Sequence, residues 1–383
     1  MKITNPPAKE VSFTFEEKGR ATDSLARTGA FTTPHGVIPT PAFMPVGTRA
    51  SVKGLQPAEL RAIGTTMLLA NTYHLALRPG AEVVRELGGL HRFMGWDGPI
   101  LTDSGGYQVF SLGHLSATDE DGVTLRSIVD GSPLRLEPEG VVDLQLDLGG
   151  DVIMAFDHCP SDPTDRAGVE ASTQRTQRWL ERCVRHFRER GGTDRGQALF
   201  GIVQGGVFED LRRASVEASV SHDLAGYAIG GVSVGEDRAS MRAALAHSAP
   251  YLPADRPRYL MGIGQPIDFF DAIEKGVDLF DCVTPTRHGR NHQAFTSLGR
   301  LNLRNRRFRT DDSPLDPDCD CVTCTHHSRG YLRHLATSGE MLAAILLTLH
   351  NVRFFHRLFE DFREAIQAGS MQPLRARIVR AQG

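Results

Sequence analysis

The stretch Pro41-Ala-Phe-Met-Pro-Val-Gly-Thr48 best separates two possible α/β folds for this chain. It is a short apolar run that ends at a glycine, as expected of a buried strand. In a nucleotide-binding open sheet, the first strand leads into a G-x-G-x-x-G phosphate loop. This strand ends without that loop, and the chain has no G-x4-G-K-[ST] motif either. The sequence therefore favours a closed barrel over a doubly wound sheet.

Further apolar runs follow at regular spacing, and amphipathic stretches separate them. The apolar runs are Pro41–Val46, Thr66–Ala70, Pro99–Leu101, Val152–Phe156, Leu199–Val203, Tyr227–Ile229, Arg258–Met261 and Leu279–Val283. The amphipathic stretches are Pro57–Ile63, Gly80–Leu87, Glu139–Leu148, Val169–Phe187, Phe208–Val220, Ala239–His247 and Pro266–Val277. Eight strand–helix units are the count of a TIM barrel. We therefore predict an α/β fold, a (β/α)8 barrel.

Polar residues stand where the predicted strands end. Asp103, Asp157 and Asp281 follow the third, fourth and eighth runs or end them, and Gln204 follows the fifth. Active sites of TIM barrels lie at the carboxyl ends of the strands, so these side chains should meet at one mouth. Any one aspartate could simply cap the next helix. Three convergent carboxylates are harder to explain as caps, because unpaired buried charge is costly.

These residue types suit displacement at an anomeric carbon. Two carboxylates can serve as nucleophile and as general acid and base, as in retaining glycosidases. A third carboxylate, with Gln204, glycine amides and Tyr107, suits a purine-like ring, because these groups can bond its polar edge and stack on its face. The residues alone thus predict an enzyme that cuts an N-glycosidic bond within RNA or DNA, with the nucleotide flipped out.

Charge is unevenly distributed along the chain, whose formal net charge is −3. Between Asp281 and Thr310 there are seven arginines and one acid, a local excess of +6. The arginines are Arg287, Arg290, Arg300, Arg304, Arg306, Arg307 and Arg309. Such a run is usually a solvated face. Because arginine is the cation best suited to phosphate, we predict a nucleic-acid partner.

A tight cysteine cluster follows the basic run. Cys319, Cys321 and Cys324 form a C-x-C-x2-C motif, and such close cysteines rarely satisfy disulfide geometry. With one histidine they suit a closed structural Zn²⁺ site, and His350 is favoured as the fourth ligand. The rival histidines are His326, His327 and His334. We therefore predict one structural zinc ion per subunit. The alternative is that the three cysteines are free thiols on the surface.

The chain has no segment with the apolar length of a membrane helix, and its first residues lack the apolar core of a signal peptide. The cysteines outside the cluster are scattered and suggest no disulfide framework. We therefore expect a cytoplasmic protein without a membrane partner.

Several long motifs resemble the bacterial-type queuine tRNA-ribosyltransferase family, the tRNA-guanine transglycosylases. The motifs are Thr40–Thr48, Asn71–His74, Thr102–Gln108, Phe156–Asp157, Gly201–Gly205, Tyr227–Gly231, Asp281–Arg287 and the Cys3His set. The resemblance implies exchange of guanine at the wobble position of GUN-anticodon tRNAs, those for aspartate, asparagine, histidine and tyrosine. The incoming base is usually 7-aminomethyl-7-deazaguanine in bacteria, and the exchange is a step in queuosine biosynthesis.

The resemblance also implies roles for individual residues. Asp281 matches the nucleophile that bonds ribose C1′, Asp103 the general acid and base, and Asp157 the residue that reads the guanine-type edge. The other base-binding candidates are Ser104, Gly105, Tyr107, Cys159, Gln204, Gly231, Val232, Glu236 and Met261. The tRNA-binding candidates are Thr286, Arg287, Arg290, Arg304 and Arg307.

The chain departs from the family pattern beside the base pocket. His158 stands where glutamate is common, and Val232 where leucine is common. Both are expected near the pocket for the 7-substituent, so direct incorporation of queuine is an alternative. A non-catalytic tRNA-binding paralogue, a zinc hydrolase and a carbohydrate glycosidase are rival interpretations. The presence of both Asp281 and Asp103 argues against the paralogue.

We expect three parts along the chain. A barrel with an N-terminal extension and the active site occupies residues 1–285, and a basic zinc-binding subdomain occupies 286–350. A helical segment that closes on the barrel occupies 351–383. The family resemblance suggests a homodimer.

Overall fold

The computed structural model describes residues 13–107, 116–160, 162–232 and 237–382. Within these residues, eight parallel strands close into a barrel in the order β10-β11-β12-β13-β14-β4-β5-β6. They are β4 (Ala42–Gly47), β5 (Leu68–Ala70), β6 (Ile100–Thr102), β10 (Val152–Met154), β11 (Ala198–Val203), β12 (Gly226–Ile229), β13 (Arg258–Leu260) and β14 (Leu279–Cys282). Each overlaps its predicted apolar run, so the TIM barrel is confirmed.

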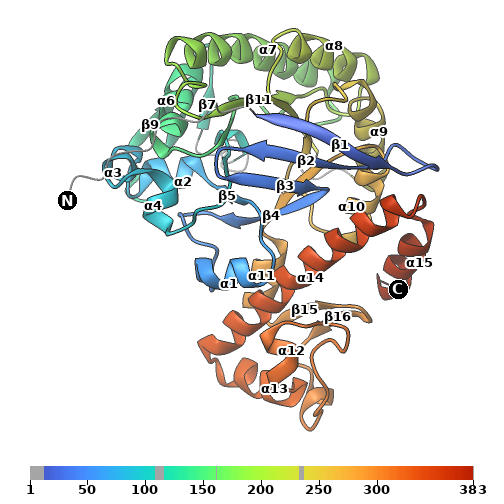
Figure 1. Cartoon of the computed structure of the whole chain (residues 1–383). Coiled ribbons are helices and arrows are strands. Elements are labelled where there is room, and N and C mark those ends of the chain that lie inside the picture. Colours follow the sequence, from blue (N-terminus) through green and yellow to red (C-terminus); the bar gives the residue numbers. More distant parts are fainter. Residues whose placement is uncertain (1–12, 108–115, 161, 233–236, 383) are drawn as a thin grey trace.

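Helices alternate with these strands and cover the barrel from outside (Figure 1). They are α1 (Pro57–Ala62), α2 (Thr72–Leu77), α3 (Ala81–Glu86), α4 (Gly89–Met94), α6 (Pro138–Leu148), α7 (Arg166–Glu189), α8 (Glu209–Val220), α9 (Arg238–Ala246) and α10 (Pro266–Ile273), with the short η2 (Ala249–Tyr251). Local capping fixes several starts. The Asp165 carboxylate accepts the Gly168 N–H at the start of α7, and the Asn71 side chain accepts the His74 N–H at the start of α2.

An antiparallel sheet closes the end of the barrel at which the strands begin. Its strands are β1 (Thr14–Arg20), β2 (Arg27–Thr33) and β3 (Gly36–Thr40). The buried Arg27 guanidinium donates two hydrogen bonds, of 3.0 and 2.8 Å, to Asp278, the residue before β14. His35, in the β2–β3 turn, contacts Asp151, the residue before β10. The sheet therefore lies opposite the predicted active mouth.

A second antiparallel sheet is inserted between β6 and α6. Its strands are β7 (Ser116–Thr118), β8 (Val123–Arg126) and β9 (Pro133–Leu136). The turn after β7 packs on α7, because the Trp179 indole N–H donates to the Glu120 carbonyl at 2.7 Å. This sheet was not predicted from the sequence, because its strands are only three or four residues long.

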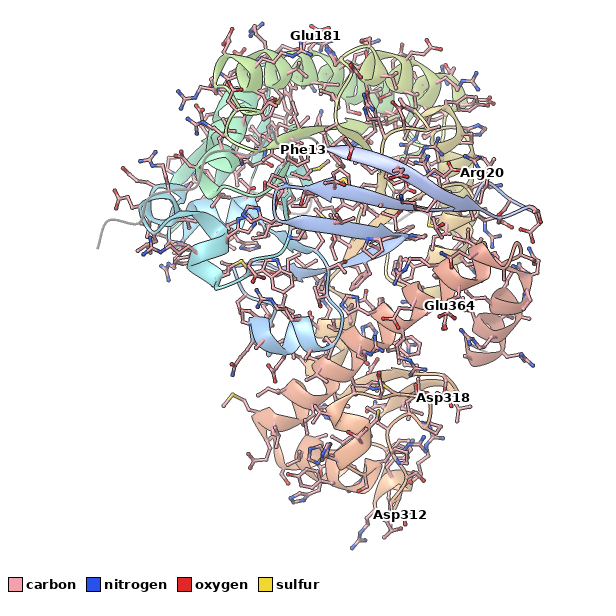
Figure 2. All side chains as sticks on the ribbon, in the orientation of Figure 1. Phe13, Arg20, Glu181, Asp312, Asp318 and Glu364 are labelled. Atoms are coloured by element: carbon pink, nitrogen blue, oxygen red, sulfur yellow. The ribbon has the colours of Figure 1, made fainter. Side chains whose placement is uncertain are left out.

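The C-terminal part forms a subdomain that projects from the barrel (Figure 1). The projecting elements are β15 (Gln293–Thr296), β16 (Gly299–Asn302), η3 (Arg306–Phe308), α12 (Val322–His326) and α13 (Arg329–Ser338). They follow α11 (Thr284–Arg290) at the barrel mouth; α14 (Met341–Gln367) leads back to the barrel, and α15 (Gln372–Gln382) contacts α10 and β16. Figure 2 marks Asp312 at the far tip of the subdomain. The helix α14 crosses the expected division after residue 350 without a break. It carries His350 in the subdomain and packs Phe355 and Phe359 on Phe43 of the barrel.

Candidate active site

A cavity of about 510 Å³ opens at the carboxyl ends of the barrel strands. All three predicted carboxylates, Asp103, Asp157 and Asp281, line it. The other predicted residues in its wall are Ser104, Gly105, Tyr107, Cys159, Gly231, Val232, Met261, Thr286, Arg287 and Arg290. Residues from distant parts of the sequence therefore meet at one mouth, as a barrel requires.

Asp281, at the end of β14, is held through one of its two oxygens. Its Oδ1 accepts the Tyr259 hydroxyl at 2.6 Å and the Gly262 N–H at 2.9 Å. Burial raises the pKa of this carboxyl, and the two hydrogen bonds partly oppose the rise. Both bonds go to Oδ1, and the Oδ2 atom accepts no hydrogen bond from the described residues.

Asp103 follows β6 and is anchored by the start of α2. Its Oδ1 accepts the Thr72 N–H at 2.9 Å, and its Oδ2 accepts the Asn71 side-chain amide. Burial raises the pKa of Asp103 to about 7, and the nearby charge of Asp281 adds to the rise. A carboxyl with this pKa can give and take a proton near neutral pH, as a general acid and base must.

Asp157 forms the polar floor of the cavity. Its Oδ2 accepts the Gln204 amide at 2.7 Å, and its Oδ1 accepts the Ser104 hydroxyl at 3.3 Å. The Cys159 thiol lies 3.7 Å from Oδ2. Gln204 itself is fully buried behind Asp157, and its Oε1 has no hydrogen-bond partner among the described residues. This floor offers hydrogen-bond acceptors to a ligand.

Glycines let backbone and ligand approach this floor. A Cβ atom at Gly106 would lie 2.3 Å from Asp157 Oδ1, and one at Gly231 would lie 2.3 Å from Gln204 Oε1. Gly231 also has a φ of +64°, which side chains rarely adopt. A larger residue at either position would therefore displace the polar groups of the floor.

Positive side chains border the mouth. Lys53, Arg287 and Arg290 line the cavity. Burial lowers the pKa of Lys53, and the charges of Arg290, Arg49 and Arg287 lower it further. Because these cations lie close together, their combined positive charge can attract the phosphate backbone of a nucleic acid.

Some predicted residues lie elsewhere. Arg304 and Arg307 belong to the projecting subdomain, where the Arg307 guanidinium covers the Phe308 ring at 4.6 Å. Glu236 lies outside the described residues. His158 does not line the cavity, because its ring turns to α7 and its Nδ1 lies 3.1 Å from Arg175.

Four residues of the site were assigned no individual role from the sequence: Tyr259, Asn71, Lys53 and Arg49. Tyr259 is fully buried in β13, and an aromatic residue with a hydroxyl within a short apolar run was a usable signal. Asn71 stands directly after β5, at a strand end like the aspartates. Lys53 and Arg49 lie on the loop after β4, and only the folded barrel brings them to Arg290.

The cysteine cluster forms a separate, closed centre. Cys319, Cys321, Cys324 and His350 are all buried, and their ligand atoms lie within 4.8 Å of one another. The His350 Nε2 donates to the Phe295 carbonyl at 2.7 Å, which turns Nδ1 toward the sulfur atoms. Three thiolates and one imidazole fit tetrahedral Zn²⁺. The predicted Cys3His site is confirmed, with His350 and none of its rivals as the fourth member.

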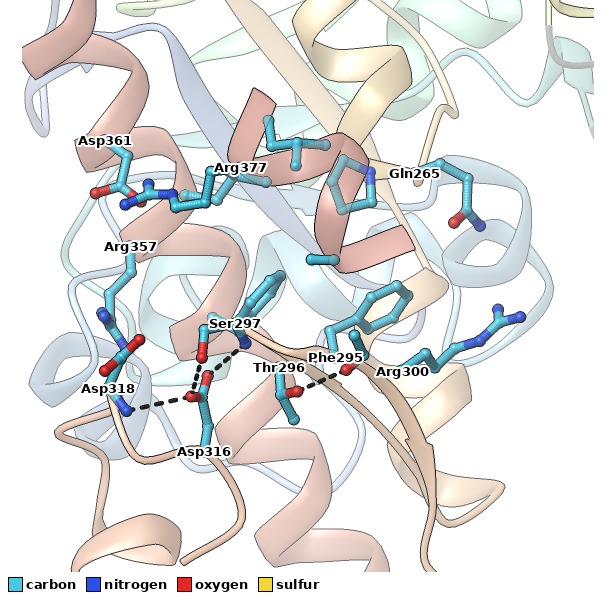
Figure 3. Close-up of a pocket in the computed structure, with 16 residues that line it drawn as sticks. Gln265, Phe295, Thr296, Ser297, Arg300, Asp316, Asp318, Arg357, Asp361 and Arg377 are labelled. Carbon is cyan, nitrogen blue, oxygen red and sulfur yellow. Dashed lines mark hydrogen bonds and ion pairs between the residues drawn. The ribbon is translucent and has the colours of Figure 1, made fainter. Parts of the chain in front are cut away.

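Another cavity, of about 310 Å³, lies between the β15–β16 hairpin, α14 and α15 (Figure 3). Two of its three acids are engaged within the protein: Asp316 accepts the Ser297 hydroxyl at 2.6 Å, and Asp361 pairs with Arg377. Arg300 of the basic run lines this cavity, but none of the described residues assigned individually to base or tRNA binding does. We therefore assign the chemistry to the barrel mouth.

Comparisons with known proteins agree with this geometry. The family model described as queuine tRNA-ribosyltransferase matches residues 22–383. A queuine tRNA-ribosyltransferase of Herpetosiphon aurantiacus is 54% identical over 344 residues, which cover 90% of this chain and 86% of that protein. One of Thermus thermophilus is 55% identical over 357 residues, covering 93% and 91%. One of Pelotomaculum thermopropionicum is 51% identical over 366 residues, covering 95% and 97%. The chain belongs to the queuine tRNA-ribosyltransferase family.

Proposed function

We propose that this tRNA-guanine transglycosylase exchanges guanine at the wobble position of GUN-anticodon tRNAs for 7-aminomethyl-7-deazaguanine. The exchange passes through a covalent bond between Asp281 and the ribose. The observation that carries this proposal is the meeting of Asp281, Asp103 and Asp157 in one cavity bordered by cations. Direct incorporation of queuine is the second candidate, because the chain carries Val232 in the cavity wall where leucine is common.

In the first half of the reaction, Asp281 Oδ2 attacks ribose C1′ and the bond from C1′ to guanine N9 breaks. Asp103 protonates the departing guanine. In the second half, Asp103 takes a proton from the incoming base, whose N9 then displaces Asp281 from C1′. Two inversions at C1′ give net retention, so one nucleophile suffices.

The incoming base would bind against the acceptors of the floor. Asp157 can accept from the ring N–H and the exocyclic amine, and the Gly231 amide can donate to the ring carbonyl. Gln204 was expected to bind the base directly. Its amide group instead donates to Asp157 Oδ2. Its unpaired Oε1 lies beside Gly231, so Gln204 supports the base through Asp157 or turns its amide when the base binds.

Val232 and Cys159 line the cavity, and His158 does not. This supports selection of the 7-substituent by Val232 and Cys159 rather than by His158. Tyr107 and Met261 also line the cavity and would enclose the ring.

The tRNA would reach the mouth over its cationic border. Lys53, Arg287 and Arg290 are placed to meet the phosphates beside the flipped nucleotide, and Arg304 and Arg307 extend the contact along the subdomain. A cytoplasmic homodimer, with 286–350 as the basic zinc-binding part, completes the proposal.

The test is exchange of labelled guanine into a tRNA transcript with a GUN anticodon. Loss of the label on addition of the aminomethyl base, but not of queuine, is the expected result. A transcript with another wobble base is the matched control and should take up no label. Loss of label with queuine would favour the second candidate, and absence of incorporation would contradict the proposed function.

A further inference from the structure

A second group of metal-ligating side chains lies at the opposite end of the barrel from the active mouth. It consists of His35 from the β2–β3 turn, His91 from α4 and Asp151 from the position before β10. One ligand atom from each residue lies within 4.8 Å of the others. The three positions are far apart in the sequence, and the fold alone brings them together.

Both imidazoles face one buried carboxylate. The His35 Nδ1 lies 2.7 Å from Asp151 Oδ1, and the His91 Nε2 lies 3.1 Å from Asp151 Oδ2. The two rings stack, with centroids 3.6 Å apart and 15° between their planes. The Ile100 N–H donates to Asp151 Oδ2 at 2.8 Å. Asp151 is thus oriented by the backbone of β6, as carboxylate ligands of metals commonly are.

The cluster is also open on one side. A cavity of about 270 Å³ is lined by His35 and Asp151 together with Gly149, Gly150 and Arg195. It leaves room for water molecules to complete a coordination shell that three protein ligands leave open.

We propose that His35, His91 and Asp151 bind one divalent transition-metal ion of the Zn²⁺ type. Two imidazoles and one carboxylate are a donor set that suits zinc, cobalt or nickel better than magnesium or calcium, which prefer oxygen ligands alone. Each ring nitrogen now faces its own oxygen of Asp151. A metal ion bound by the two ring nitrogens and the Asp151 carboxylate would replace the protons that they now share. Its binding would require the His35 ring to rotate, and this side chain is 41% exposed and stands in a turn.

The ion would join three elements. It would tie the turn of the β1–β3 sheet to α4 and to Asp151, the residue before β10. The Arg27–Asp278 pair holds the same sheet at another barrel strand, β14. This site is independent of the Cys3His centre and of the proposed base exchange.

To test this, the protein with its Cys3His site filled is dialysed against a series of Zn²⁺ concentrations. The number of zinc ions bound per chain is then measured. Two ions per chain are expected, and His35→Ala should leave one. His91→Ala and Asp151→Asn should weaken the second site at least about tenfold, since loss of a supporting contact alone costs 10- to 100-fold. His222→Ala, at a histidine outside both clusters, is the control and should retain two ions.

Two results would overturn the inference. One is a wild-type protein that binds a single zinc ion per chain at every concentration. The other is an unchanged second site in His35→Ala, a substitution at a half-exposed turn that leaves the buried groups in place. In either case the two histidines serve only as hydrogen-bond donors that hold Asp151.

Discussion

The barrel mouth and the Cys3His centre are both buried groups of polar side chains, yet they are organised in opposite ways. In the zinc centre, four donors converge on one point, and the second nitrogen of His350 is fixed by the Phe295 carbonyl. In the mouth, each carboxylate has its own partners, and within the described residues Asp281 and Gln204 each keep an oxygen free. Burial raises the pKa of Asp103 and of Asp281. A site whose polar atoms all have partners stabilises the fold. A site that keeps polar atoms without partners is less stabilising but leaves those atoms available to react.

The largest effect is expected from Asp281→Asn, which removes the proposed nucleophile and keeps the shape of the side chain. Base exchange should fall by at least about 1,000-fold, because loss of a covalent nucleophile removes the whole route. Zinc content and thermal stability should stay close to those of the wild type. Asp255→Asn, at an exposed acid, is the control and should keep full exchange of labelled guanine.

The corresponding change in the Cys3His centre, Cys321→Ser, should reduce stability. The variant should lose its zinc and more than about 3 kcal/mol of unfolding free energy, because metal binding contributes directly to folding. Cys183→Ala replaces a buried cysteine outside the cluster and should retain the zinc. Metal analysis and thermal unfolding measure both variants. A zinc-free Cys321→Ser protein with unchanged unfolding would contradict the assigned structural role.

Tyr259→Phe tests whether the Tyr259 hydroxyl controls the pKa of Asp281, the proposed nucleophile. Removal of the hydroxyl that donates to Asp281 should raise the pKa of this carboxyl further. The acid limb of the pH profile for adduct formation should then move up by about one pH unit, a loss of about tenfold on that limb. Tyr227→Phe is the matched control, because the Tyr227 hydroxyl accepts the Leu224 N–H away from the mouth. An unmoved profile would show that Tyr259 does not tune the nucleophile.

The two half-reactions should respond to pH in opposite directions. Below its pKa of about 7, Asp103 is protonated and can donate to departing guanine; above it, Asp103 is ionised and can accept from the incoming base. Between about pH 6 and pH 8, adduct formation should fall about tenfold and adduct resolution should rise by a similar factor. Single-turnover measurements of each step check this. Parallel profiles would exclude Asp103 from one of the two roles.

The smallest effects are expected at the cationic border. Arg287→Ala should reduce the slope of log affinity for tRNA against log salt by about one, because one phosphate contact is lost. Arg188→Ala, far from the mouth, should leave the slope unchanged. Filter binding over a range of salt concentrations measures both slopes. Equal slopes for wild type and Arg287→Ala would remove Arg287 from the tRNA contact.

The barrel and most of the site could be predicted from the sequence, because both depend on patterns within short stretches of neighbouring residues. Each barrel strand is a short apolar run, and Asp103, Asp157 and Asp281 stand at or directly after the end of one. The cysteine spacing likewise limited the metal site to a few candidate histidines. These features are encoded within a few neighbouring residues.

What the sequence did not show depends on tertiary contacts. The bond from Tyr259 to Asp281 joins two strands, and the direction of the His158 ring depends on where α7 lies. The meeting of His35, His91 and Asp151 depends on a turn, a helix and a strand from three parts of the chain. Spacing along one sequence carries no information on such distances.

Covalent catalysis by Asp281 can be tested by the intact mass of the protein after it is mixed with a GUN-anticodon RNA hairpin and denatured. We predict a protein–RNA adduct in the wild type, released on addition of the incoming base, and its absence in Asp281→Asn. An adduct of the same yield in Asp281→Asn would place the nucleophile elsewhere and contradict the proposed mechanism.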